Sequence, residues 1–304
     1  MSKFLPFNII SRKCKIFTSF LHPDNDGITD ELYKQIEGQA HAYLFLWWSS
    51  INKKEEYSNW YKILSKYTNI DTTVLCPTIE DCNILSEIGF KTLFCHHSSF
   101  LDDELFYAYE KRQPIYNAIY NAQILPYKRI ELCKDLRDWC LISHTNENKD
   151  IHSEYRKTIL HLIGDRTLKN PNIFLQPKEV CNYINQSKCG LMLSAEEGGN
   201  YATVEYLLCG IPVITTPNIG GRNEFLNKEN SIMIHPDSYS VASAVNTLRV
   251  EKFDKFKIRT SVLEVINKHR SNFYKNLTEK FGGDWETDYI YCNKLLNWTN
   301  NFEL

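Results

Sequence analysis

The chain has 304 residues, of which 43% are hydrophobic, 13% aromatic and 24% charged. This composition is typical of globular proteins and excludes collagen-like repeats, coiled coils and disorder along the whole length. The 35 basic and 37 acidic residues give a formal net charge of −2, so the overall charge does not indicate a nucleic-acid or polyanion binder.

The cysteines and the apolar runs indicate where the protein works. The ten cysteines lie mostly in apolar runs and form no CxxC pair, which favours free buried thiols in a reducing compartment. The most apolar run, AYLFLWW, is too short to span a bilayer, and the N-terminus lacks a small-residue cleavage site. We therefore expect a cytoplasmic protein whose membrane association is at most peripheral.

Strand-like and helix-like segments alternate along the first half of the chain. Short β-branched or aromatic runs followed by amphipathic stretches predict βαβ units around a parallel sheet. A first helix begins at Thr29, whose side chain can cap it, and a second ends at Gly89. The strands predicted in this half are KCKIFTSF (core 14–20), AYLFLWW, TTVLC and KTLFC.

The second half repeats the alternation more regularly. The expected strands are 115–120, WCLIS, NIFLQ, GLMLS and IPVITT, and the expected helices are YKRIELCKDL, KEVCNYINQ and YATVEYLLC. In the tail, WETDYIYCNKLLNW carries one apolar helical stripe. We expect two Rossmann-like α/β domains, 1–105 and 106–280, facing across a cleft, with a helix in 281–304 crossing back to the first.

Residues 190–224 carry the chemistry. They read as a strand, two carboxylates, a Gly-Gly turn, the N-terminus of a helix and a third carboxylate within that helix. Asn200 to Thr203 form an anion site, because a helix N-terminus presents unpaired amides and a partial positive charge. Glu197 and Glu205 can grip hydroxyl groups on either side of that anion. A phosphate between two diol-bearing groups is a nucleotide sugar.

These residues resemble a known family. Glu197 and Glu205 stand in the pattern EGGxxxxxE, followed by CGIPVI and GG..E, and this EX7E motif resembles the retaining GT-B glycosyltransferases of family four, the glycosyl transferases group 1. NAQILPYKRIEL is similar to the segment that opens the C-terminal domain of that family, and SSFLDDELF is similar to its linker. HPDNDGITDEL resembles the glycine-bearing loop after its first strand. The resemblance implies a GT-B fold.

The resemblance also implies a role for individual residues. Glu205 would hold the ribose hydroxyls, and Glu197 would contact the transferred sugar together with the amides of the glycine turn. Lys128 would neutralise the diphosphate, and the loop around Gly27 would close over it. The further donor-binding candidates are Gly198, Gly199, Asn200, Tyr201, Thr203, Arg129, Gly220 and Gly221.

The sequence departs from the family pattern at three places. Asn121-Ala122 stands where the family has Gly-Arg, so one phosphate cation is missing unless Arg129 replaces it. Asp26-Gly27 stands where Gly-Gly is usual, and the first half is shorter than in most members. Two alternatives therefore remain: a nucleotide-sugar-binding protein without transferase activity, or another nucleotide-sugar enzyme such as an epimerase.

The motifs predict a donor substrate but no cofactor. No DXD-type motif follows a strand, and His96 and His97 lack supporting ligands at metal-binding spacing, so we expect no stable metal. The resemblance implies a UDP- or GDP-sugar as donor. The acceptor remains open among a glycan, a lipid-linked sugar, a protein and a modified nucleobase. Two local alternatives also remain: Glu196 competes with Glu197, and Trp47 and Trp48 serve either the core or a ligand.

Overall fold

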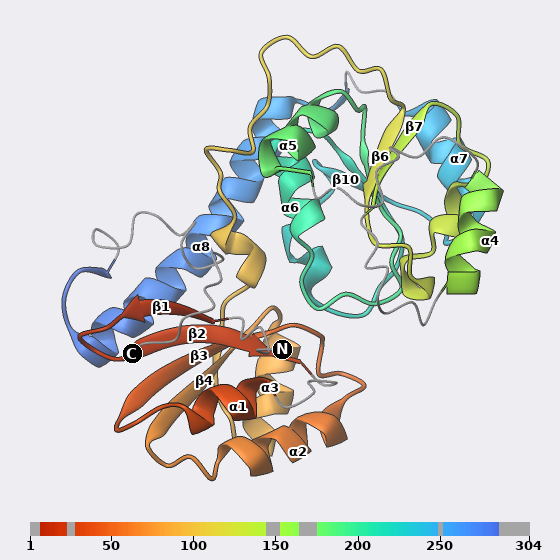
Figure 1. Cartoon of the computed structure of the whole chain (residues 1–304). Helices are drawn as coiled ribbons and strands as arrows, with labels where there is room; N and C mark the ends of the chain where they lie inside the picture. The colour runs from red at the N-terminus through yellow and green to blue at the C-terminus, as the bar shows by residue number, and fades with distance from the viewer. Residues whose placement is uncertain (1–6, 23–27, 144–152, 164–174, 249–251, 286–304) are drawn as a thin grey trace.

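The computed structural model describes residues 7–22, 28–143, 153–163, 175–248 and 252–285. Within these ranges the chain forms two five-stranded β-sheets, each with helices packed against it (Figure 1). The first sheet takes its strands from residues 7–94 and the second from residues 118–233. The expectation of an α/β protein with two parallel sheets is thereby confirmed.

The first sheet has the strand order β1-β2-β3-β4-β5. Its strands are β1 (Phe7–Ser11), β2 (Ile16–Leu21), β3 (Ala40–Leu46), β4 (Ile70–Cys76) and β5 (Lys91–Phe94), and its helices are α1 (Ile28–Lys34), α2 (Lys54–Leu64) and α3 (Ile79–Ile88). All neighbouring pairs are parallel except β1 with β2. The four predicted strands are present as β2 to β5, whereas β1 was not predicted.

Strand β3 shows why this sheet is buried on both faces. Its side chains alternate between the faces, as in any strand. Ala42, Leu44 and Leu46 belong to one apolar cluster together with residues of α1, α2 and α3. Tyr43 and Phe45 belong to a second cluster on the opposite face. The uninterrupted apolar run in the sequence therefore reflects a central strand with packing on both sides.

The second sheet is parallel throughout, with the order β10-β9-β8-β6-β7. Its strands are β6 (Ala118–Asn121), β7 (Trp139–Ile142), β8 (Gly190–Met192), β9 (Val213–Thr215) and β10 (Ser231–Met233), and its helices are α4 (Ser153–Ile163), α5 (Pro177–Asn185), α6 (Tyr201–Leu208) and α7 (Ser238–Thr247). The predicted strand NIFLQ lies mostly outside the described residues.

The helix predicted over YKRIELCKDL is wrong. Two short 3-10 helices, Pro126–Lys128 and Ile130–Cys133, occupy this segment. Arg129 between them has φ 52° and ψ 42°, the left-handed region, which interrupts right-handed helical hydrogen bonding. The carbonyl of Lys128 instead accepts a hydrogen bond from the Tyr120 hydroxyl at 2.6 Å. This tertiary bond holds Lys128 above the end of β6.

Helix α8 (Lys255–Phe281) connects the two halves (Figure 1). Its first turns contribute Ile258, Val262 and Ile266 to the core around the second sheet. Its last turns contribute Phe273 and Leu277 to the cluster on the face of the first sheet. One helix therefore belongs to both cores. The helix predicted in 281–304 lies almost wholly outside the described residues, and the domain boundary at 105/106 stays a prediction.

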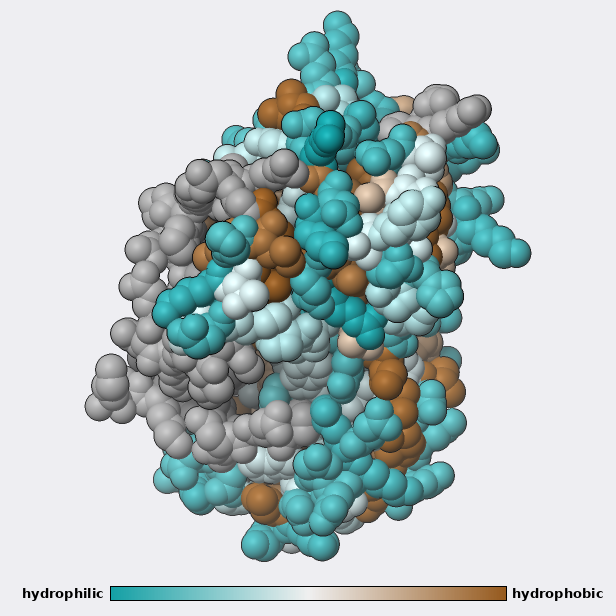
Figure 2. All heavy atoms as spheres, turned by 90° about the vertical axis from the view of Figure 1, so that its right-hand side faces the viewer, coloured by the Kyte–Doolittle hydropathy of each residue, from teal (hydrophilic) through white to brown (hydrophobic). Residues whose placement is uncertain are grey.

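The surface is mainly polar on the face that Figure 2 shows, where apolar side chains form separate groups among hydrophilic ones. Large side chains exposed on the protein include Met233 and Tyr239. Among the residues described, no helix combines the length and apolar character that crossing a membrane requires.

An ion-pair network fastens the end of α8 to the first sheet. Asp71 on β4 contacts Lys91 on β5 at 2.6 Å and Lys280 on α8 at 2.7 Å. Partial burial raises the pKa of Asp71, but the hydrogen bonds from Lys280 and Lys91 outweigh that effect and lower the pKa to about 2. The ionised carboxylate of Asp71 therefore stabilises the folded state.

We expect Asp71→Asn to reduce the free energy of unfolding at neutral pH by at most about 1 kcal/mol, because the network is partly exposed. The folded pKa lies below the unfolded value of about 3.9, so the difference from wild type should shrink as the pH falls from about 5 to about 3. Urea unfolding at several pH values measures this. Glu87→Gln, which breaks an exposed pair with Lys54, is the control. A difference that stays constant with pH would contradict the assignment.

Candidate functional site

A cavity of about 620 Å³ lies between the two sheets, beyond the carboxyl ends of their strands. Trp47 and Trp48 follow β3 of the first sheet, and Asn121 and Ile142 end β6 and β7 of the second. All four line the cavity. Ligands of parallel α/β sheets bind at such edges, where loops from several strands converge.

Most of the predicted site residues meet in this cavity. The lining includes Lys128, Glu197, Gly198, Gly199, Asn200, Tyr201 and Glu205. The remaining candidates do not line it: Arg129, Thr203, Gly220 and Gly221 lie beside it, and Gly27 is outside the described residues.

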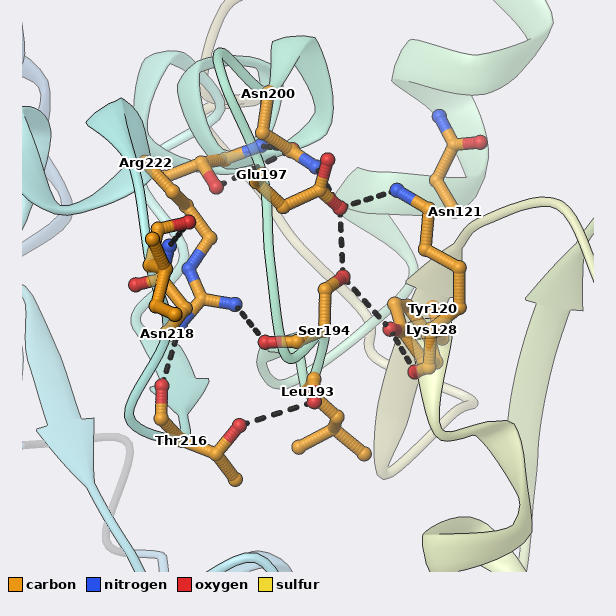
Figure 3. Close-up of polar contacts among 12 residues, drawn as sticks. Tyr120, Asn121, Lys128, Leu193, Ser194, Glu197, Asn200, Thr216, Asn218 and Arg222 are labelled. Atoms are coloured by element: carbon orange, nitrogen blue, oxygen red, sulfur yellow. Dashed lines mark hydrogen bonds and ion pairs between the residues drawn. The ribbon is translucent and has the colours of Figure 1, made fainter. Parts of the chain in front are cut away.

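The Glu197 carboxylate has three donors on one oxygen (Figure 3). Lys128 Nζ forms an ion pair with Glu197 Oε1, and both side chains are buried. Ser194 Oγ donates to the same oxygen at 2.6 Å, and Asn200 Nδ2 donates to it at 3.1 Å. Burial of an ion pair is costly unless further hydrogen bonds satisfy its atoms, and here they do.

The two adjacent glutamates point to different places. Glu197 lines the cavity, whereas Glu196 Oε1 lies 3.4 Å from Lys53 Nζ, a lysine of the first half. Lys53 also lies 5.9 Å from the centroid of the Trp48 ring. Of these two neighbours, Glu196 therefore contacts the first half of the chain and Glu197 lines the cavity.

Glu205 lies on α6 and has one amide donor. Asn121 Nδ2, at the end of β6, donates to Glu205 Oε2 at 3.1 Å. Burial raises the pKa of Glu205 to about 7, and the hydrogen bond from Asn121 opposes that rise. The carboxylate is thus poised to gain a further hydrogen-bond donor, since any donor would favour its ionised form.

The glycine turn touches the first half of the chain. A Cβ atom on Gly198 would lie 2.0 Å from the carbonyl oxygen of Trp47, and one on Gly199 would lie 1.9 Å from His97 Cε1. Burial lowers the pKa of His97 to about 4, so its ring is neutral at physiological pH. The ring stacks on Trp47 at an interplanar angle of 15°. These glycines permit contact between the halves, and their amides line the cavity.

Gly220, Gly221, Thr203 and Arg129 shape the site from outside the cavity. Gly220 has φ 112°, and a Cβ atom on it would lie 1.8 Å from the Glu197 carbonyl. Gly221 N donates to the Gly198 carbonyl at 2.8 Å, and Thr203 N donates to Asn200 Oδ1 at 2.9 Å. Arg129 Nη1 is buried and has no hydrogen-bond partner among the described residues.

Sequence reasoning did not find Ser194 and Arg222. Arg222 is fully buried, and its guanidinium donates to the carbonyls of Ser194, at 3.1 Å, and Thr216 (Figure 3). Ser194 is polar at the end of the apolar strand GLMLS, which is a usable signal. For Arg222 the signal is weaker, because an arginine after Gly-Gly in a loop usually faces solvent.

Trp47 and His97 lie together at this site. Trp47 is half-buried and His97 is buried. For Trp47 and Trp48 the sequence left a core role or a ligand role open; both tryptophans line the cavity, and Trp47 also stacks on His97. Among the residues that the structure covers, no group of three or more His, Cys, Asp or Glu side chains could hold a metal ion.

Comparison with known proteins identifies the second half of the chain. Residues 145–249 match the model of the family Glycosyl transferases group 1. This match covers part of the second half of the chain. No curated protein sequence matches the chain.

Solved structures identify the fold of the whole chain. HepE from Anabaena, solved with UDP and glucose, aligns with a TM-score of 0.59 at 12% identity over 83% of this chain and 81% of its own. Sucrose-phosphate synthase from Thermosynechococcus elongatus aligns with a TM-score of 0.56 at 15% identity over 86% of this chain and 71% of its own. A glycosyltransferase from Rickettsia africae aligns with a TM-score of 0.53 at 14% identity over 87% of this chain and 77% of its own. The chain has the GT-B fold, with two Rossmann-like sheets facing each other.

Because Gly199 lies so close to His97, we expect a methyl group added at residue 199 to destabilise the protein. Gly199→Ala should destabilise the protein by roughly 1–3 kcal/mol through overpacking. His97→Ala in the same chain should restore part of that loss, because the obstructing ring is then absent. Thermal unfolding of the two single variants and the double variant measures the coupling. Equal destabilisation by Gly199→Ala with and without His97 would contradict the contact.

Proposed function

We propose that the protein is a retaining glycosyltransferase that moves a sugar from a nucleotide-diphosphate sugar to an acceptor hydroxyl. One observation carries the proposal: a single cavity brings together Lys128, Glu197, Glu205 and the N-terminus of α6. This set supplies a cation and amides for a diphosphate, with a carboxylate on either side. The group 1 family match supports a transferase.

Glu205 is proposed to hold the nucleoside ribose. Its carboxylate has one donor, Asn121, and lines the cavity, so it can accept hydrogen bonds from the ribose diol. The ribose does not change during the reaction. This contact therefore contributes to donor affinity and equally to the transition state.

Lys128 and the amides of the glycine turn are proposed to bind the diphosphate. Negative charge develops on the leaving diphosphate as the glycosidic bond breaks, and cations or helix N-terminal amides stabilise it. Asn200 caps α6, and the turn before it lines the cavity. Because these groups provide positive charge, the proposal requires no bound metal ion.

Glu197 is proposed to act on the transferred sugar. Positive charge develops at the anomeric carbon, and a fixed carboxylate beside it stabilises that charge. Its three donors hold the side chain in one orientation. The departing phosphate would take the proton of the acceptor, so the proposal needs no further base on the protein.

The donor is proposed to be a UDP-sugar, with a GDP-sugar as the alternative. HepE from Anabaena, which shares the fold, has been solved with UDP-glucose, and that structure aligns with this chain with a TM-score of 0.54. Because of this likeness, UDP-glucose is the first of the UDP- and GDP-sugars to test. A screen of donors and acceptors would identify the transferred sugar and the class of acceptor.

A second candidate is a nucleotide-sugar-binding protein without transferase activity. Lys128 already forms an ion pair with Glu197, and Ala122 stands where the family pattern has an arginine. Fewer free cations then face a diphosphate than in a typical member. This candidate predicts binding of UDP-glucose without release of UDP.

The test measures UDP release from UDP-glucose by the whole chain, with and without chelator, and the anomeric configuration of the product by NMR. Glu197→Gln should reduce turnover on the order of a hundredfold while leaving UDP affinity nearly unchanged. Glu196→Gln is the matched control and should keep full turnover. Binding without UDP release would favour the second candidate, and loss of turnover with chelator would refute metal independence.

Glu205 gives a pH prediction of its own. Only its ionised form accepts both ribose hydroxyls, so the affinity for UDP-glucose should rise with pH through about 7, by up to about tenfold per unit below that value. Glu205→Gln should weaken binding about tenfold at high pH and abolish this dependence. Calorimetric titration at several pH values measures both. An unchanged pH dependence in the variant would assign the effect to another group.

A further inference from the structure

The proposed function places two demands on Lys128. In the structure its ammonium group pairs with Glu197 Oε1, yet the proposed reaction requires it at the diphosphate. When Lys128 turns toward the diphosphate, Glu197 loses the one ion pair that it forms among the described residues. Within the described residues, the remaining donors to its carboxylate are Ser194 Oγ and Asn200 Nδ2.

Ser194 is the closer of these two donors and is fully buried. It follows β8, where the chain has left the sheet and no strand ladder fixes it. Its hydroxyl also lies 3.4 Å from the Tyr120 hydroxyl (Figure 3). The position of Glu197 therefore depends on what holds Ser194.

Arg222 holds Ser194 in place. One arm of its guanidinium donates to the Ser194 carbonyl at 3.1 Å, and the other donates to the Thr216 carbonyl. Ser194 follows β8 and Thr216 follows β9, so the planar fork connects the ends of two neighbouring strands (Figure 3). The side chain is 0% exposed, which makes this a rigid connection.

Arg222 is also a buried charge with a specific counter-charge. Burial lowers its pKa to about 10, and the negative charge of Glu197 opposes that fall. Arg222 Nε has no hydrogen-bond partner within the described part of the chain. The charged and titratable groups around this centre are Glu197, Lys128, Arg129, Tyr120 and Glu196. A desolvated cation is costly, so it needs a compensating interaction.

We propose that Arg222 is a positioning residue that keeps Glu197 correctly oriented, through Ser194, while Lys128 serves the diphosphate. The proposal rests on the proposed function, because Lys128 leaves Glu197 only if a diphosphate arrives. Arg222 itself contacts neither the cavity nor the substrate. It acts by fixing the Ser194 backbone, whose hydroxyl then holds Oε1, and by supplying positive charge behind the carboxylate.

A purely structural brace is the alternative. Such a brace would affect stability, and activity only in proportion to the folded fraction. A positioning role affects the chemical step in fully folded protein, so it lowers kcat and leaves the affinity for free UDP unchanged.

The experiment compares Ser194→Ala, Arg222→Lys, the double variant and a control. Ser194→Ala removes the hydroxyl bond to Glu197 but keeps the carbonyl that Arg222 contacts. Ser187→Ala removes another fully buried serine hydroxyl, which donates to Tyr183 O at 2.9 Å and does not reach Glu197. For each protein we would measure the melting temperature, UDP affinity by calorimetry, and kcat with UDP-glucose across pH.

We expect Ser194→Ala and Arg222→Lys each to lower kcat by roughly tenfold to a hundredfold, with UDP affinity within about twofold of wild type. The double variant should be no worse than the more impaired single variant, because both act on Glu197. Ser187→Ala should change none of these values beyond a lower melting temperature.

Unchanged kcat in folded Ser194→Ala would overturn the inference while leaving the proposed function intact. Additive losses in the double variant, or losses of kcat and UDP affinity in parallel, would also overturn it and favour the structural brace. If Arg222→Lys fails to fold, Ser194→Ala decides alone. A wild-type protein that binds UDP-glucose but releases no UDP would instead refute the proposed function, and the inference with it.

Discussion

The contact between the glycine turn and the edge of the first sheet is the constraint on which the site depends. At Gly198 a single methyl group would lie 2.0 Å from the Trp47 carbonyl oxygen, so only glycine allows the two backbones to meet. This contact brings Trp47, Trp48 and Glu197 to one cavity. Were the turn further away, Glu197 would face solvent and its pairing with Lys128 would be weakened by water.

Helix α8 makes that close contact possible at the scale of the fold. It contributes Val262 to one core and Phe273 to the other, so both sheets are fixed to the same rigid element. Arg270 on this helix also donates to the carbonyls of Ser99 and Leu101, which follow β5. The geometry of the cavity thus depends on apolar packing distant from the chemistry. A helix shared by two cores resists relative rotation better than a flexible linker.

The sequence predicts the fold well because its signals are local. Alternating strand-like and helix-like runs, and the EX7E spacing with its glycine turn, are visible in short windows, and the cavity contains both glutamates. The helix over 127–136 is the instructive failure. Its residues favour a helix, but the Tyr120 hydroxyl donates a hydrogen bond to the Lys128 carbonyl, and Arg129 adopts a left-handed conformation. A side-chain bond from the end of β6 to a carbonyl eight residues later outweighed helix propensity, and propensity alone does not reveal such a bond.

The proposed division of labour between the two glutamates rests on the donors around them, which the motif alone does not determine. Glu197 receives an ammonium, a hydroxyl and an amide on one oxygen, whereas Glu205 receives one amide, and burial raises its pKa to about 7. The first environment is preorganised, because three donors converge on one oxygen. The second is incomplete and gains stability when a ligand supplies hydroxyl donors. Fixed charge suits a group that faces a changing anomeric carbon, and an incomplete hydrogen-bond environment suits a group that recognises an unchanging diol.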